Sequence, residues 1–525
     1  MLGPARLIRH GWRPVGDEAA IALRSWNSLT AHGPLVGQAT RLAHGVFDPG
    51  PLEYWLLAIP VHLDTVHGVL WGAIIFCLVA CSLAVEAAWS VLGAAGGLCA
   101  SGFIVGLTLW MPIIAVTPSW NPWFGLMFFI AALAAAWAVM SGHRGWWPAL
   151  VISASIAAQS HLMFTVPSGA LAILALIVGL VDTIRGRAGS RWVVAGLIAG
   201  AACWSGPLIQ QFTSRNGNLG LLLRSSGGSG GGARTGGAFS LRALSAATEP
   251  VPIWLKPSMH PLAIYRLINH RPAWFALAVL VLLAVAAVMA VRPLRCRPLG
   301  SLAVVSLVIS LGSLVTYSSI PVHHTSLNTL IYLIVLLFPV GVLSWLVVGG
   351  WAVLTARLVI RQLTSARPAG GWWRGRPAGG PAPAPARPLR GALPLAGLAA
   401  TALVAVGAIL AISLQGPTVR EVTDDPAMPT SWAASRQIAR ALPGQPIALS
   451  VHDFKKSALG RLSLGLTWAL TPEGFRAELM HTRLARELGS RYVFRGEAIP
   501  LVKVRVRPSG TSVAVTRPAR LASRP

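Results

Sequence analysis

Apolar blocks of about 20 residues recur along this chain and constrain its fold more than any other feature. A helix needs about 20 apolar residues to cross a hydrocarbon core of ~30 Å. Of the 525 residues, 54% are hydrophobic and only 11% are charged. A soluble chain of this size needs more charge to cover its surface. The pattern therefore predicts an all-α polytopic membrane domain.

Ten such blocks are present, and we expect about ten membrane spans. They lie at residues 68–90, 92–116, 122–141, 146–163, 167–184, 192–211, 273–292, 300–318, 326–358 and 391–414. The block 326–358 is too long for one span and short for two. We expect one tilted or broken passage with its break at Pro339, because proline removes a helix hydrogen bond.

The net charge of +27 raises the question of nucleic acid, but the basic residues are placed as in a membrane protein. They cluster in short connections between apolar blocks, as the positive-inside rule requires. Connections expected in the cytoplasm carry Arg144, then Arg185, Arg187 and Arg191, then Arg292, Arg295 and Arg297. We therefore expect a multi-pass protein of the cytoplasmic (cell) membrane, with the lipid bilayer and not nucleic acid as its partner.

This orientation divides the chain into five parts. We expect a first extracytoplasmic loop with juxtamembrane helices at 1–66, a multi-span domain at 67–363 with an external loop at 212–272, a cytoplasmic Pro/Arg/Gly linker at 364–390, a last span at 391–414, and a small extracytoplasmic α/β domain at 415–525. The Gly-rich segment 225–237 is either a lid over a site or a plain insertion.

The C-terminal part alternates helical and strand patterns. We expect helices near 430–442 and 473–488, and strands at 446–453, 491–496 and 500–507. The final stretch, from about residue 508, is expected to be frayed.

Acidic residues concentrate in the segment 16–57, which holds four of the sixteen in the chain. Asp17 and Glu18 stand in GDEAAIALRSW, and Asp48 and Glu53 stand in FDPGPLEYWLL. A carboxylate at the edge of a membrane domain is costly unless it pairs or has a function. From the residues alone, Asp17 either caps a helix, pairs with Arg24 or takes part in chemistry.

Other polar residues lie at the outer ends of spans. Asn121 either lines a cavity or caps a helix, and His161 either reacts or is simply packed. Gln211 and Arg215 either bind a sugar or phosphate or form a polar helix exit. No Cys/His spacing predicts zinc, and paired His323 and His324 lack carboxylate neighbours, so we assign no metal ligand.

GDEA, followed some thirty residues later by DPGPLEYWLL, resembles the first external loop of the C-type membrane glycosyltransferases. The likeness is to the family 39 and aminoarabinose-transferase-like branch, which includes the protein O-mannosyltransferases. It implies that a sugar moves from a polyprenyl-phosphate donor to an extracytoplasmic acceptor, which is a glycan, a lipid or a protein. A divalent metal ion is left open as a cofactor.

The resemblance also implies roles for individual residues. Asp17 would be the base that takes the acceptor's proton, and Glu18 would orient Asp17 or the acceptor. The departing phosphate needs positive charge, which basic residues at the outer rim would supply. The expected substrate-binding residues are Arg24, Asp48, Glu53, Asn121, His161, Gln211 and Arg215.

Two features depart from the family pattern. Asp48 stands where relatives have a histidine before the proline turn. Relatives also carry a transmembrane helix before the acidic pair, whereas residues 1–15 are too short and too basic to span, so we expect the first family helix to be missing. Two other functions remain open, a lipid-linked sugar flippase or transporter and a non-catalytic cell-envelope membrane protein.

Overall fold

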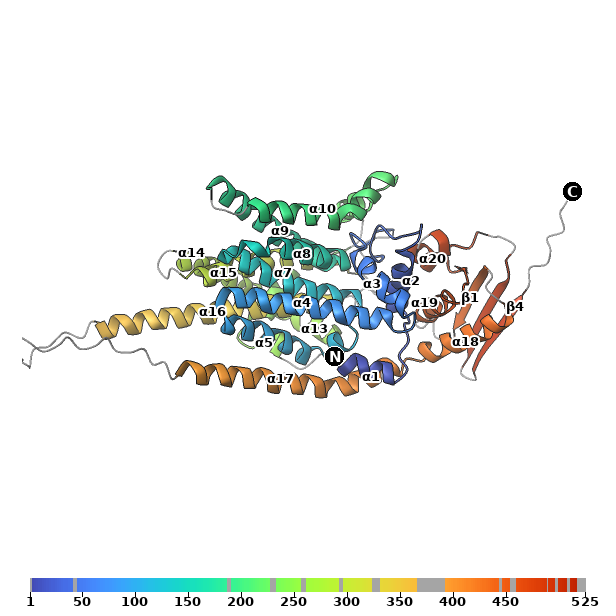
Figure 1. The fold of residues 1–525 in the computed structure, drawn as a ribbon. Helices are drawn as coiled ribbons and strands as arrows, with labels where there is room; N and C mark the ends of the chain where they lie inside the picture. Colours follow the sequence, from blue (N-terminus) through green and yellow to red (C-terminus); the bar gives the residue numbers. More distant parts are fainter. Residues whose placement is uncertain are drawn as a thin grey trace, which may run out of the picture.

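The structure is a computed structural model, and most of the chain is described in it. The described residues are 2–40, 45–186, 190–226, 233–255, 261–291, 296–322, 331–365, 392–442, 446–453, 459–488, 490–495, 499–507 and 510–516. The expected linker, apart from its first two residues, and the centre of the Gly-rich segment lie outside these ranges. Long helices run side by side along one direction, and a small α/β domain sits at one end of them (Figure 1).

The helices of the bundle follow the apolar blocks of the sequence. They are α4 (Gly68–Leu92), α5 (Ala94–Trp110), α6 (Pro112–Val116), α7 (Asn121–Ser141), α8 (Trp147–Ser160), α9 (Leu162–Ile184), α10 (Ser190–Thr213), α14 (Ala273–Val291), α15 (Arg297–Ser318), α16 (Ile331–Ser365) and α17 (Ala392–Thr423). Shorter helices α11 (Asn218–Ser226), α12 (Gly236–Thr248) and α13 (Pro261–Asn269) lie between α10 and α14.

Among the described residues, seven helices are long and apolar enough to cross a membrane. An eighth candidate is the bent pair formed by α13 and α14, whose axes meet at 81°. Helices α5, with 17 residues, and α8, with 14 residues, occupy two of the other expected blocks but are shorter. The expected all-α polytopic membrane domain with a small C-terminal sheet is confirmed, with seven or eight full-length candidate spans in the described part of the chain.

The long block near residue 340 forms one helix. Helix α16 continues for 35 residues with Pro339 inside it, so the expected break at Pro339 is not present. Proline removes one hydrogen bond of a helix, but neighbouring helices hold the rest of the turn in place. Val335, Leu336, Leu337 and Val340 around it are all fully buried.

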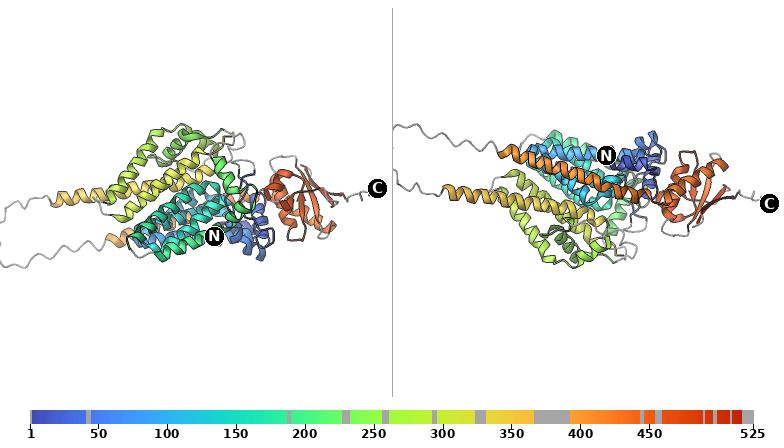
Figure 2. Two further views of the ribbon diagram at one scale, coloured as in Figure 1. Left: turned by 90° about the horizontal axis from the view of Figure 1, so that it is seen from above. Right: turned by 90° about the horizontal axis from the view of Figure 1, so that it is seen from below.

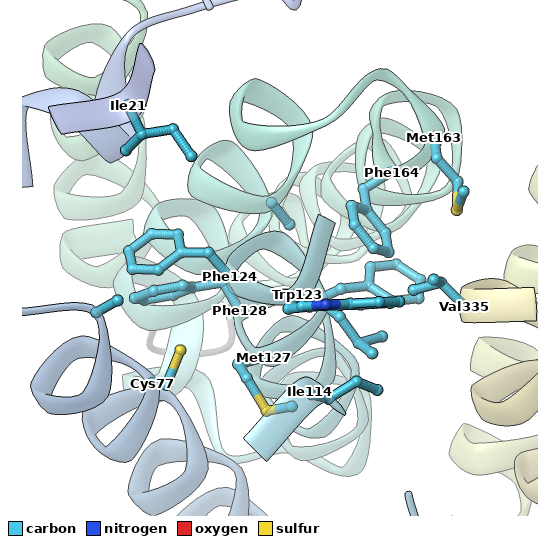
Figure 3. Packing of buried hydrophobic residues seen from close by; sticks show 14 of the residues in the cluster. Ile21, Cys77, Ile114, Trp123, Phe124, Met127, Phe128, Met163, Phe164 and Val335 are labelled. Carbon is cyan, nitrogen blue, oxygen red and sulfur yellow. The ribbon is translucent and has the colours of Figure 1, made fainter. Parts of the chain in front are cut away.

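The core of the bundle is centred on α7, which is buried along most of its length. Figure 3 shows Trp123, Phe124 and Phe128 of this helix packed among residues of its neighbours, including Phe164 of α9. Helices in lipid associate through close packing, which small residues permit. A Cβ on Gly125 would lie 3.0 Å from the Phe164 ring, so this glycine allows α7 and α9 to pack closely.

The described residues of the first segment lie at the end of the bundle that faces the C-terminal domain (Figure 1). They form α1 (Leu2–Arg9), α2 (Asp17–Asn27) and α3 (Leu52–Leu63). Helix α1 packs against α17 and α6, whereas α2 packs against α3 and the C-terminal domain. The acidic segment of the sequence is therefore held at the junction of the two parts of the protein.

The C-terminal domain is a four-stranded sheet with helices. Its elements are α18 (Ala427–Ala441), β1 (Ile447–Asp453), α19 (Leu459–Leu470), β2 (Ala477–Leu479), α20 (Thr482–Leu488), β3 (Leu501–Arg507) and β4 (Gly510–Thr516). The strand order is β2-β1-β3-β4, with β1 parallel to β2 and β3, and β4 antiparallel to β3. Figure 2 shows the sheet at the far side of the domain from the bundle.

Several expectations for this domain were wrong. The segment 473–488 is not one helix, because Gly474 turns the chain at φ +82° and the next residues pair with β1. Helix α19 was not expected. The segment 491–496 contributes a single bridge, between Leu479 and Val493, and the stretch after residue 508 forms strand β4 rather than fraying at once.

Helix α19 lies between the sheet and α2 and joins the domain to the first segment. Its residues from Leu462 to Leu470 are buried. Trp468 contacts Trp26 of α2 edge to face, with ring centroids 6.1 Å apart. At the C-terminal end of α2, the Asn27 amide donates to the Tyr492 hydroxyl at 2.9 Å, and Arg491 donates to the Asn27 oxygen at 3.1 Å.

Candidate active site

Gly16 sets the start of α2 and the direction of the acidic pair. Its backbone has φ +59° and ψ −131°, a conformation that residues with a side chain rarely adopt. Gly16 is the N-cap, and no side chain caps the helix. Asp17 therefore does not cap α2, which removes one of the readings left open by the sequence.

Asp17 is held by two donors that come from different parts of the chain. The indole N–H of Trp120 donates to Oδ2 at 2.9 Å, and the amide of Gln38 donates to Oδ1 at 3.1 Å. Asp17 is partly exposed. Donors to both oxygens fix the plane of the carboxylate, so Asp17 is oriented as a general base requires.

Glu18, the next residue, has a different environment. Its pKa is raised to about 7, mainly by burial and also by the neighbouring carboxylates of Asp17 and Asp425. Its own backbone N–H and Arg461 act in the opposite direction. The two adjacent carboxyl groups are therefore unlike: Asp17 is bound by neutral donors, and Glu18 titrates near neutral pH.

Asp48 forms a second, buried group. Its Oδ1 accepts from the backbone N–H of Leu162 at 2.8 Å, and its Oδ2 lies 3.4 Å from the Asn121 amide. Asn121 also donates to the carbonyl of Ser160 at 2.9 Å. Burial raises the pKa of Asp48 well above its ordinary value, against the lowering effects of the Leu162 N–H and Arg24. This carboxyl joins the start of α7 to the start of α9.

Backbone pairing connects the two carboxyl groups. Gly37 donates to the Asp48 carbonyl at 2.9 Å, and Asp48 donates to the Gln38 carbonyl at 2.7 Å. The side chain of Gln38 meanwhile holds Asp17. The Asn218 side chain makes two hydrogen bonds to the backbone of Phe47. It accepts from the Phe47 N–H at 2.9 Å and donates to the Phe47 carbonyl at 3.0 Å. These bonds fix the loop that carries Gln38 and Asp48, and they thereby set the positions of the Asp17 and Asp48 carboxyl groups relative to each other.

Arg24 and Glu53 are also buried in this region. Arg24 donates to the Val36 carbonyl at 2.8 Å, and its guanidinium lies 5.0 Å from the centre of the Tyr54 ring. Burial, followed by the charge of Asp48, raises the pKa of Glu53 well above its ordinary value. The structure thus brings Asp17, Glu18, Arg24, Asp48, Glu53 and Asn121 to one end of the bundle.

The remaining predicted residues lie at the edge of this group or apart from it. His161 is the N-cap of α9, where its Nδ1 accepts from the Met163 N–H at 3.3 Å. Gln211 accepts from the Gly220 N–H at 3.1 Å and ties α10 to α11. Arg215 is exposed in the turn between these helices. Among the described contacts, neither Gln211 nor Arg215 joins the groups around Asp17 and Asp48.

Several residues of the site were not predicted from the sequence. They are Gln38, Asn218, Asp425 and Arg461. Arg461 and Asp425 come from the C-terminal part of the chain and form an ion pair beside Glu18. Among the described residues, no group of three or more His, Cys, Asp or Glu could hold a metal ion.

The comparison with known proteins gives a likeness of fold. No protein-family model and no curated protein matches the chain. Two solved structures do, both of ArnT from Cupriavidus metallidurans. The form bound to undecaprenyl phosphate is 13% identical, covers 100% of this chain and 98% of its own, and has a TM-score of 0.51. The apo form is 15% identical, covers 97% and 95%, and has a TM-score of 0.52. The resemblance seen in the first segment is thus confirmed at the level of the whole fold.

Proposed function

We propose that this membrane protein transfers a sugar from a polyprenyl-phosphate donor to an extracytoplasmic acceptor. The observation that carries the proposal is the carboxylate of Asp17, held by Trp120 and Gln38 at the end of the bundle beside the C-terminal domain. A solved structure of similar fold has undecaprenyl phosphate bound. The fold thus suits a lipid-borne substrate, and Asp17 supplies a base.

The orientation follows from the charges at the opposite end of the bundle. Arg144, Arg185 and Arg297 lie in or beside the connections there. Cytoplasmic connections carry an excess of basic residues. The end with α2 and the C-terminal domain then faces away from the cytoplasm of a cell membrane, where a lipid-linked sugar in the outer leaflet reaches it.

The reaction is a substitution at the anomeric carbon of the sugar. Asp17 takes the proton of the acceptor hydroxyl, and the acceptor oxygen bonds to the anomeric carbon. The bond from that carbon to the phosphate oxygen breaks and releases the polyprenyl phosphate, whose charge requires positive groups nearby. Glu18, whose pKa is raised to about 7, orients the acceptor hydroxyl toward Asp17.

The test is sugar transfer by Asp17→Asn protein in membrane vesicles supplied with radiolabelled polyprenyl-phosphate sugar. Asparagine still accepts one hydrogen bond but is not basic, so transfer should fall at least about 100-fold while the amount of folded protein stays unchanged. The matched control is Asp424→Asn, which removes an exposed carboxylate at the same end of the bundle.

Two outcomes contradict the proposal. Transfer that survives in Asp17→Asn rules out Asp17 as the base. Labelled lipid that crosses the vesicle membrane with its sugar still attached, in wild-type protein and without any transfer, identifies a flippase instead.

A further inference from the structure

Arg461 of the C-terminal domain contacts Gly16, the residue directly before the acidic pair Asp17 and Glu18. Its backbone carbonyl accepts the N–H of Gly16 at 3.3 Å. Its side chain crosses the same residue, and its Cγ lies 3.3 Å from the point where a Cβ on Gly16 would stand. Gly16 is thus held by Arg461 from α19, some 445 residues later in the chain.

The charged end of Arg461 is balanced by a second residue. Its guanidinium pairs with Asp425, which lies in the short turn between α17 and α18. The side chain of Asp425 is largely buried, at 13% exposed, whereas that of Arg461 is 54% exposed. Both residues act on Glu18 and in opposite directions, since Arg461 favours the carboxylate and Asp425 disfavours it.

We propose that Arg461 is a positioning residue for the acidic pair, whose main chain holds Gly16 and whose guanidinium, balanced by Asp425, stabilises the carboxylate of Glu18. The idea rests on the proposed function in assigning Glu18 to the reaction. It adds that the C-terminal domain is an integral part of the site. Arg461 need not touch the substrate, because it acts through Gly16 and Glu18.

The elements around α2 bring few other charges to this end of it. On α2 itself, Asp17 is the neighbour that acts on Glu18. Helix α3 brings His62, which stacks on Trp26, eight residues further along α2 and therefore about 12 Å away. Glu53 of the same helix interacts with Asp48. Arg491 contacts Asn27 at the far end of α2, so Arg461 and Asp425 are the charges to vary.

The test compares the dependence of sugar transfer on pH in Arg461→Met and Asp425→Asn proteins. Loss of Arg461 raises the pKa of Glu18. The limb of the pH–rate profile that Glu18 governs should therefore move to higher pH. Loss of the Asp425 charge lowers that pKa and should move the same limb downward. Each shift should be roughly half a pH unit, as expected for one partly exposed charge.

The opposite signs separate the proposal from a structural role. Both variants break the same ion pair, so a contact that only holds the domain in place predicts similar losses in both and no displacement of the limb. That result would overturn the proposal. Arg461→Lys, which keeps the charge, should restore the wild-type limb, and a limb that stays displaced in this variant also contradicts it.

A second readout does not depend on transfer activity. The carboxyl stretch of Glu18 can be titrated by infrared spectroscopy and assigned by its loss in Glu18→Gln protein. Its midpoint should rise in Arg461→Met and fall in Asp425→Asn. If these midpoints move as expected while no sugar is transferred, the proposed function fails and the role of Arg461 stands; unmoved midpoints refute the role of Arg461 alone.

Discussion

The carboxylate of Asp17 accepts a hydrogen bond from the indole of Trp120, with 2.9 Å between Nε1 and Oδ2. These residues are 103 positions apart and belong to different parts of the protein, the first segment and the start of α7. Trp120 also packs edge to face on Trp123, with ring centroids 5.1 Å apart. The core of the bundle therefore orients the proposed base.

Trp120→Phe should lower sugar transfer by roughly 10- to 100-fold, because a hydrogen bond to a charged group contributes about 1.5–3 kcal/mol. The phenyl ring keeps much of the packing on Trp123, so the protein should remain folded. Transfer rates in vesicles, normalised to the amount of protein, measure the effect.

The control is Trp123→Phe, which makes the same replacement of an indole by a smaller phenyl ring at the neighbouring tryptophan. The indole N–H of Trp123 has no hydrogen-bond partner among the described residues. This variant should lose less than 5-fold in transfer by the same reasoning. Equal losses in the two variants would mean that the ring volume matters and the bond to Asp17 does not.

Asp48 should matter for stability through its bond to the start of α9. Asp48→Ala leaves the buried Leu162 N–H without an acceptor, which costs about 1–3 kcal/mol. Asp48→Asn keeps that acceptor and gives up the long contact to Asn121, so it should lose less. Thermal unfolding in detergent ranks the two, and an asparagine variant as unstable as the alanine variant would show that the acceptor for Leu162 is not what Asp48 contributes.

The raised pKa of Glu18 predicts how the stability of the folded protein depends on pH. Its pKa in the folded protein, about 7, lies above its ordinary value of 4.5. Between these values the folded chain binds a proton that the unfolded chain releases, so stability should fall as pH rises from 4.5 to 7. Glu18→Gln removes this dependence and should raise the unfolding midpoint at pH 8 by roughly 1–3 °C, with no change at pH 4. A variant that follows the wild-type curve throughout would contradict the assignment.

Asn27 should hold the C-terminal domain to α2. Asn27→Ala removes the bonds to Tyr492 and Arg491 and should weaken this contact by about 1–3 kcal/mol. Limited proteolysis should then release the C-terminal domain faster than from wild-type protein. Gln437→Ala, an exposed change on α18, is the control and should leave the release rate unaltered.

The sequence predicted the elements whose signal is local. Apolar blocks marked the long helices because a span needs a fixed length of apolar residues, and strand β3 was found from its alternation, with Val502 and Val504 buried and Lys503 and Arg505 exposed. Helix α19 was missed. It is buried between the sheet and α2, and its residues therefore lack the polar face that marks a surface helix.

The residues of the candidate site that were predicted are likewise those with a local signal in the sequence. Asp17 and Asp48 stood out because acidic residues are rare in this chain. Partners such as Gln38 and Arg461 did not, because nothing at their own positions marks them and their role depends on contacts across the fold. Gln211 and Arg215 were chosen as polar residues at a helix end, but that end lies apart from the carboxyl groups.

The contact between Gly16 and Arg461 has a consequence for the order of synthesis. A ribosome makes the acidic pair more than four hundred residues before it makes Arg461. During most of translation the nascent protein therefore sits in the bilayer with its carboxylates lacking their late partner. A product that ends before Arg461 would keep Asp17 and Glu18 without this contact, so the proposed site can form in full only after Arg461 has been made.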